Sequence, residues 1–129
     1  MLMRSIFCIL VKDGKILLTR DGMNWSIPNT RFNPQDYEIE VAFRLLEGIG
    51  IERNEAELVR ESGPFQLDGT LTFVMFFITE KDPDVRDFIW AEPEELKRFK
   101  TIPDINQILE LSRGSSVVER HAHKHDFMR

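Results

Sequence analysis

The segment from Ser5 to Lys12 constrains the fold more than any other, because it is apolar at almost every position. A strand with one solvent-exposed face alternates apolar and polar residues, so a continuous apolar run indicates a strand buried on both faces. Asp13-Gly14 then marks a tight turn into a second apolar segment, Lys15 to Arg20. The sequence therefore predicts a β-hairpin at the heart of a sheet.

One longer helix is predicted after a polar loop that runs from Asn29 to Asn33. Asn33 suits the N-cap and Pro34 the first helical position. Asp36, at the third position, can accept hydrogen bonds from free amides, as in a capping box. We expect the helix to end at Glu47 or shortly after, because two nearby glycines can adopt the left-handed cap conformation at little cost.

The other elements alternate between strands and helices, which favours an α/β class with an α/β/α layered architecture. The most apolar segment, Leu71 to Ile78, is expected at the centre of the sheet. Gly63-Pro64 and Asp68-Gly69 are expected to form turns. Further elements are predicted as a short extended piece at 25–28, strands at 56–61 and 88–90, and short helices at about 93–99 and 104–111.

The chain has 129 residues, which suffice for one compact core. We expect one domain over residues 1–111 and a basic, histidine-containing tail over 112–129. No apolar run approaches the roughly 18 residues of a membrane span, so we expect no membrane partner and a cytoplasmic location. The net charge of −5 predicts no nucleic-acid partner. An acidic body would also repel a free polyphosphate unless cations or local arginines intervened.

Two further features have a less specific interpretation. Cys8 is the single cysteine and lies within the first apolar run, so we expect a buried, inert thiol rather than a nucleophile. The three histidines, at 121, 123 and 125, all fall in the tail. On an extended strand they would share one face and could hold Zn²⁺ or Ni²⁺. A poorly structured tail is the favoured interpretation.

The region around the predicted helix resembles the signature of the Nudix family, G-x5-E-x7-R-E-U-x-E-E-x-G-U after a W-x-x-P-G-like approach, where U is a bulky aliphatic residue. A similar closing strand and short helix extend the resemblance to roughly residues 5–111. It implies a Nudix-like α/β/α sandwich with a mixed central sheet. The matching residues are Trp25 and Pro28 of the approach, Thr30 at the box glycine, Asp36 at the first glutamate, Arg44 at the arginine and Leu46 at the aliphatic position.

The resemblance implies hydrolysis of a nucleoside diphosphate linked to another group. In the family, clustered glutamates hold Mg²⁺ or Mn²⁺, which neutralises the pyrophosphate and activates water. Here the box is degenerate. Leu45 stands where the glutamate after the arginine belongs, and Gly48 and Ile49 stand where the metal-binding pair belongs. Because the segment to Gly50 is one residue short, Glu47 can take the place of that pair's first member.

Helical geometry leads to the same conclusion without the alignment. At about 100° per residue, four charged residues fall within an arc of roughly 80° and form a stripe of alternating sign. Glu40 and Arg44 in that stripe are spaced for an intrahelical ion pair. A separate, apolar face would look into the active-site cleft and cannot ligate a metal. The stripe is Asp36, Glu40, Arg44 and Glu47, and the apolar face is Val41, Leu45, Gly48 and Ile49.

Each candidate site residue also has an ordinary structural interpretation. Asp36 fits a helix cap, Glu47 an exposed helix-end carboxylate, and Trp25 a wall of the core or cleft. Arg44 could brace the preceding loop, as the resemblance implies for the family's arginine. The candidates are Glu47, Arg44 and Asp36 for catalysis, Arg31, Thr30 and Trp25 for ligand contact, and Glu47 for metal binding.

Three hypotheses about function stay open from the sequence. The first is a Nudix-fold module that binds a nucleotide-like ligand or a partner, with hydrolysis lost or very weak. The second is an active hydrolase whose Mg²⁺ or Mn²⁺ ligands are rebuilt from Glu47, Glu40 and the acidic segment 80–84. The third is an interaction module or homo-oligomer that uses the face of Val41, Leu45 and Ile49, if that face is open to solvent.

Overall fold

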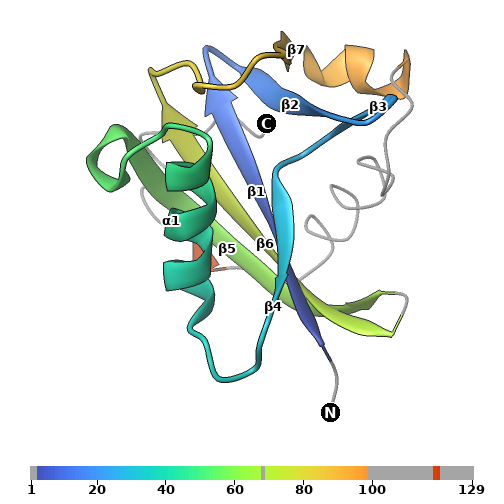
Figure 1. Cartoon of the computed structure of the whole chain (residues 1–129), viewed down its shortest axis with the longest axis vertical. Helices are drawn as coiled ribbons and strands as arrows, with labels where there is room; N and C mark the ends of the chain where they lie inside the picture. The colour runs from blue at the N-terminus through green and yellow to red at the C-terminus, as the bar shows by residue number, and fades with distance from the viewer. Residues whose placement is uncertain (1–2, 68, 99–117, 120–129) are drawn as a thin grey trace.

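A computed structural model of the chain describes residues 3–67, 69–98 and 118–119. These residues form an eight-stranded mixed sheet in the order β3-β2-β1-β6-β5-β8, with β4 paired to β1 and β7 to β2 (Figure 1). β1 and β6 are parallel, and the other pairs are antiparallel. The strands are β1 Arg4–Lys12, β2 Lys15–Asp21, β3 Asn24–Ser26, β4 Asn29–Phe32, β5 Ala56–Leu67, β6 Thr70–Thr79, β7 Phe88–Ala91 and β8 Val118–Glu119.

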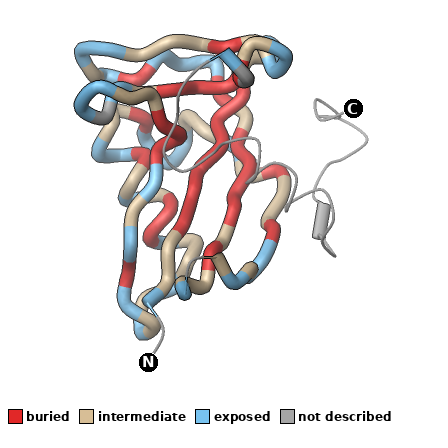
Figure 2. Tube along the Cα trace, turned by 90° about the vertical axis from the view of Figure 1, so that its right-hand side faces the viewer, coloured by how far each residue is buried: buried red, intermediate tan, exposed pale blue. Residues whose placement is uncertain are grey.

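The central strand β1 is buried on both faces, as its apolar run predicts. Ile6, Cys8 and Leu10 point to one side and pack with the helix α1, Glu38–Gly48. The residues between them pack on the opposite side with Leu96 of the 3-10 helix η2, Pro93–Arg98. Figure 2 shows these buried residues running along the middle strands. Helical elements therefore cover both faces of a mixed sheet, in an α/β/α arrangement.

The segment predicted as a polar loop is a strand. β4, Asn29–Phe32, pairs with the N-terminal half of β1, whereas β2 pairs with its C-terminal end. Phe32 is 6% exposed and packs in the core between the sheet and α1. One buried residue in a polar tetrapeptide is too weak a pattern to indicate a strand. β4 is stabilised as a strand by pairing with the part of β1 that β2 leaves unpaired.

The start of α1 differs from the prediction. The helix begins at Glu38 with Tyr37 as the N-cap, rather than at Pro34 with Asn33 as the cap. The amide of Asp36 donates a 3.0 Å hydrogen bond to the carbonyl of Asn33, so Pro34 lies in a tight turn. Asn33 and proline suit a turn as well as a helix start, and here the turn is adopted. Asp36 therefore lies before the helix and does not cap it.

The end of α1 is as predicted. The amide of Gly50, whose φ is +85°, donates to the Glu47 carbonyl at 3.0 Å, and the amide of Ile51 donates to the Leu46 carbonyl at 2.9 Å. This is the paired bonding of a Schellman cap. The Ile49 carbonyl accepts a 2.7 Å bond from the Asp84 amide. These bonds fix the helix end beside the segment that joins β6 to β7.

The remaining predicted elements agree with the structure, with two differences. Gly63-Pro64 is not a turn between strands but an irregularity within one long strand, β5, where the register shifts between Ser62 and Phe65. The predicted helix at 93–99 is the 3-10 helix η2, and a further one, η1, spans Arg53–Glu55. The predicted helix at 104–111 and the tail histidines lie outside the described residues. Within the described part of the chain, no helix is long and apolar enough to cross a membrane.

Candidate functional site

A cleft of about 380 Å³ lies between the end of β4 and α1. One wall comes from β4 and the turn that follows it, and the other comes from α1. Among its lining residues two are arginines and one is a carboxylate. The lining residues are Met3, Thr30, Arg31, Phe32, Asn33, Asp36, Val41, Arg44 and Leu45.

The pairing of β4 with β1 positions one wall of the cleft. Thr30 is opposite Ile6 and Arg31 is opposite Ser5 in the antiparallel register. The hydroxyl of Thr30 donates to the Arg31 carbonyl at 3.2 Å. Because Phe32 is buried, the strand is anchored at its C-terminal end while Arg31 stays exposed. This arrangement leaves the guanidinium of Arg31 accessible to solvent at the cleft.

The helix positions the opposite wall. Val41 is 6% exposed and packs in the core, and Leu45 is partly buried against it. Arg44 is exposed on the same side of the helix. The packing of α1 onto the sheet is reinforced by Phe43, whose ring meets that of Phe77 edge-on with centroids 5.5 Å apart. The core contacts of α1 therefore fix Arg44 and Leu45 at the cleft.

Four of the six candidate residues from the sequence line the cleft, and two do not. Trp25 packs on the opposite core of the sheet, with the Arg20 guanidinium 5.1 Å from its ring centroid. Glu47 is exposed near the end of α1 and is outside the lining. The four that come together are Asp36, Arg44, Thr30 and Arg31.

Sequence reasoning also missed three lining residues, Met3, Phe32 and Asn33. The apolar Phe32 inside a polar segment was the available signal for a buried anchor. Of the predicted cleft face, Val41 and Leu45 line the cleft, whereas Ile49 packs against the core and Gly48 lies exposed beyond it.

Glu40 does not form the ion pair predicted within the helix. Its carboxylate accepts hydrogen bonds from both terminal nitrogens of Arg53, at 2.7 and 3.3 Å. Arg53 also lies over the Phe43 ring, 4.5 Å from its centroid. The Arg53 hydrogen bond holds the pKa of Glu40 below its ordinary value. Arg53 thus forms a bidentate pair with Glu40, and Arg44 lines the cleft instead.

The donor set of the cleft is poor in the carboxylates that hold Mg²⁺ or Mn²⁺. Mg²⁺ is commonly bound through one or two carboxylates together with substrate phosphates and water, and Asp36 is the one carboxylate in the lining. Asp82, from the acidic segment proposed to rebuild the site, accepts 2.8 Å bonds from Lys12 and from the Trp90 indole. In the described ranges no three Asp, Glu, His or Cys side chains gather as a metal site would require.

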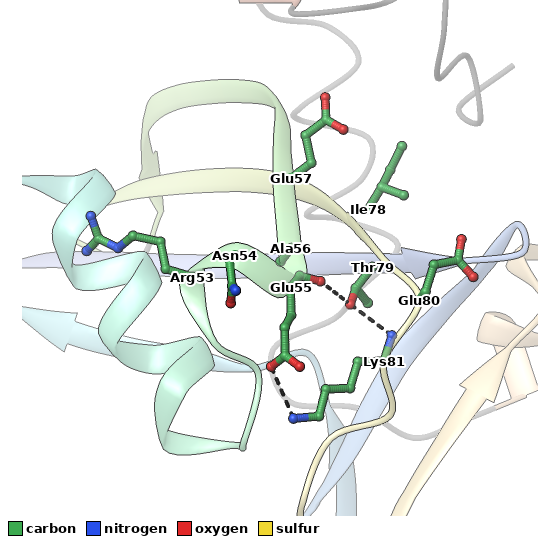
Figure 3. A pocket seen from close by; sticks show the side chains of 9 residues that line it. All are labelled: Arg53, Asn54, Glu55, Ala56, Glu57, Ile78, Thr79, Glu80 and Lys81. Carbon is green, nitrogen blue, oxygen red and sulfur yellow. Dashed lines mark hydrogen bonds and ion pairs between the residues drawn. The ribbon is translucent and has the colours of Figure 1, made fainter.

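A second cleft, of about 750 Å³, lies where η1 meets the ends of β5 and β6 (Figure 3). Three of its charged residues, Glu55, Lys81 and Arg53, are bonded to other side chains. Lys81 donates a 3.1 Å bond to Glu55, and Arg53 points away toward α1 and Glu40. The hydroxyl of Thr79 donates to the Glu55 carbonyl at 2.7 Å. These bonds stabilise the junction of η1 with the sheet, and a ligand here would have to displace them.

The fold with this cleft beside its main helix is Nudix-like, as comparison with solved structures shows. An Ap4A hydrolase from C. elegans superposes with a TM-score of 0.68 at 13% identity, over 85% of this chain and 93% of that one. A Nudix hydrolase from M. smegmatis, RenU, gives 0.68 at 10% identity over 85% and 87%. A MutT protein from Bacillus halodurans gives 0.57 at 18% identity over 92% and 85%. No family model and no curated protein matches the sequence.

Proposed function

We propose that this chain is a Nudix-fold module that binds a nucleotide or nucleoside-diphosphate-type ligand in the β4–α1 cleft, with hydrolysis lost or very weak. The observation that carries the proposal is the composition of the cleft. Arg31 and Arg44 can each bind a phosphate group in a bidentate manner. The carboxylate oxygens of Asp36 are hydrogen-bond acceptors, which suit the hydroxyls of a ribose. Val41 and Leu45 supply an apolar floor for the sugar or base.

The side chains of the helix support the proposed loss of hydrolysis. A Nudix-type reaction depends on carboxylates that hold a metal and activate water. Leu45 offers no oxygen ligand, and Gly48 carries no side chain. Glu47 lies outside the cleft, so it cannot replace them without a change in the helix end.

The two alternatives have less support. A rebuilt metal site would require carboxylates from the acidic segment 80–84, whose Asp82 is bonded to Lys12 and Trp90. An interaction surface on the apolar helix face would require that face to be open. Val41 is 6% exposed, and Leu45 and Ile49 pack against the core. The apolar face thus serves the fold, and a self-association site there would have to form at the cost of this packing.

A panel of substrates tests the proposal. NTPs, ADP-ribose, NADH and dinucleoside polyphosphates are incubated with the protein and Mg²⁺ or Mn²⁺, and phosphate or nucleotide release is measured. We expect release at the rate of a blank without protein. Turnover that disappears in Glu47→Gln would contradict the proposal and support the metal-dependent hydrolase.

A further inference from the structure

The β4–α1 cleft carries positive charge on an acidic protein. The chain has a net charge of −5, yet the cleft is lined by two arginines and one aspartate. The electrostatic potential at a surface site depends mostly on the nearest charges. Charges more than about 10 Å away are largely screened by salt at an ionic strength of about 0.1 M. The cleft therefore has a local excess of positive charge on a protein whose net charge is negative.

The two cleft arginines differ in their bonding from three other basic residues of the described chain. Arg53 is committed to Glu40, Lys12 to Asp82 and Lys81 to Glu55. For Arg31 and Arg44 no carboxylate in the described part of the chain lies within ion-pair distance. Both residues are exposed, and they can bind a ligand without first breaking an ion pair to any described residue.

The arginines come from two separate elements that the core fixes independently. The register between β4 and β1 sets the position of Arg31, and the packing of α1 on the sheet sets the position of Arg44. A planar guanidinium presents paired donors that match phosphate oxygens, which an ammonium cannot do. Two such groups line this one cleft, and each can bind one phosphate of a diphosphate.

We propose that Arg31 and Arg44 neutralise the phosphates of the bound ligand directly, so that this cleft binds a nucleoside diphosphate without a divalent cation. This inference rests on the proposed function, since it assumes that the cleft takes a nucleotide-type ligand. It assigns to two arginines the charge neutralisation that a metal supplies where helix carboxylates are present. Binding is then independent of Mg²⁺ and weakens as the salt concentration rises.

Calorimetric titration of the full chain with ADP tests the inference. Titrations are made in EDTA and in excess Mg²⁺, with the wild type, Arg31→Ala, Arg44→Ala and the control Arg86→Ala. Arg86 is exposed on the segment between β6 and β7 and does not line the cleft. We expect wild-type Kd values in the two buffers to agree within about twofold. Each cleft variant should bind about tenfold more weakly, and the control should bind as the wild type does.

The possible outcomes separate the inference from the function beneath it. Binding that requires Mg²⁺ would overturn the arginine proposal and leave nucleotide binding intact. No binding in either buffer would overturn both. Equal losses in all three variants would indicate general electrostatic attraction and contradict the cleft assignment. Because the arginines are exposed, the variants should melt at the wild-type temperature. Arg31→Lys and Arg44→Lys provide a second check, since they retain charge but lose the fork and should fall between the alanine variants and the wild type.

Discussion

The side chain at position 45 decides which chemistry the cleft can offer. A glutamate there would add a second carboxylate to the lining that contains Asp36, whereas leucine offers no ligand atom. Leu45 instead packs, partly buried, against the core between the sheet and α1. Cys8 shows a different effect of environment. Its thiol is a reactive group, but burial raises its pKa far above the ordinary value and makes it inert. Chemistry in this domain is therefore limited by the environment of individual side chains.

Asp82 supplies a residue-scale prediction about pH. Hydrogen bonds from Lys12 and then Trp90 hold the pKa of Asp82 below its ordinary value. A carboxylate whose pKa is lowered by folding stabilises the folded state above the unfolded pKa, and that contribution is lost as the pH falls through the folded pKa. Asp82→Asn should therefore lower the melting temperature modestly at neutral pH. The difference from the wild type should begin to shrink near the usual aspartate pKa of about 3.9 and vanish only below the lowered pKa of folded Asp82.

Melting curves from neutral to acidic pH measure this effect. Asp87→Asn, on the same exposed segment, provides the matched control and should change the curve little. A deficit of Asp82→Asn that stays constant down to acidic pH would show that shape and packing, rather than charge, account for the contribution of Asp82.

At the scale of elements, two glycines near the end of α1 have opposite roles. Gly48 is helical, exposed and has open space where a Cβ would lie. Gly50 has a φ of +85°, and a Cβ there would overlap the Cβ of Asp84 and lie 3.0 Å from its amide nitrogen. The first is replaceable, and the second is required by the helix cap and by the close approach of the next segment.

Alanine at each position tests this difference. Gly48→Ala should raise the free energy of unfolding by about 0.5–1 kcal/mol, because alanine has less conformational freedom to lose. Gly50→Ala should lower it by about 2–4 kcal/mol, from the left-handed conformation and the overlap with Asp84. Urea denaturation measures both. A mild effect of Gly50→Ala, equal to that of the same change at Gly69, which has a positive φ but open space, would show that the Asp84 segment yields easily.

The elements also show where sequence patterns suffice. The apolar runs predicted β1, β2 and β6 because a strand buried on both faces has a strong signature. The end of α1 was predictable from its glycines. Its start was not, because Asn33 and Pro34 suit both a turn and a cap, and only the tertiary position of the helix decides between them. β4 depends on its pairing with β1, which a local pattern does not record.

At the scale of the molecule, a Nudix-like fold surrounds a cleft that is lined by two arginines and one carboxylate. The alignment identified Asp36 and Arg44, and both line the cleft. It placed Glu47 and Trp25 near the site as well, and the structure separates them from it. The reason is geometric, because a residue at the helix end or on the far face of the sheet can be close in sequence to a site and still point elsewhere. The domain boundary at 111 and the role of the tail stay predictions.

The central claim is that the cleft binds a nucleotide-type ligand without cleaving it, and phosphorus NMR of ADP-ribose tests both parts at once. The full chain is added to ADP-ribose in Mg²⁺, and the spectrum is followed for hours. We predict that the two diphosphate resonances shift or broaden and that no AMP or ribose phosphate signal appears. Unshifted resonances would contradict binding, and product signals that depend on the protein and on Glu47 would contradict the loss of hydrolysis.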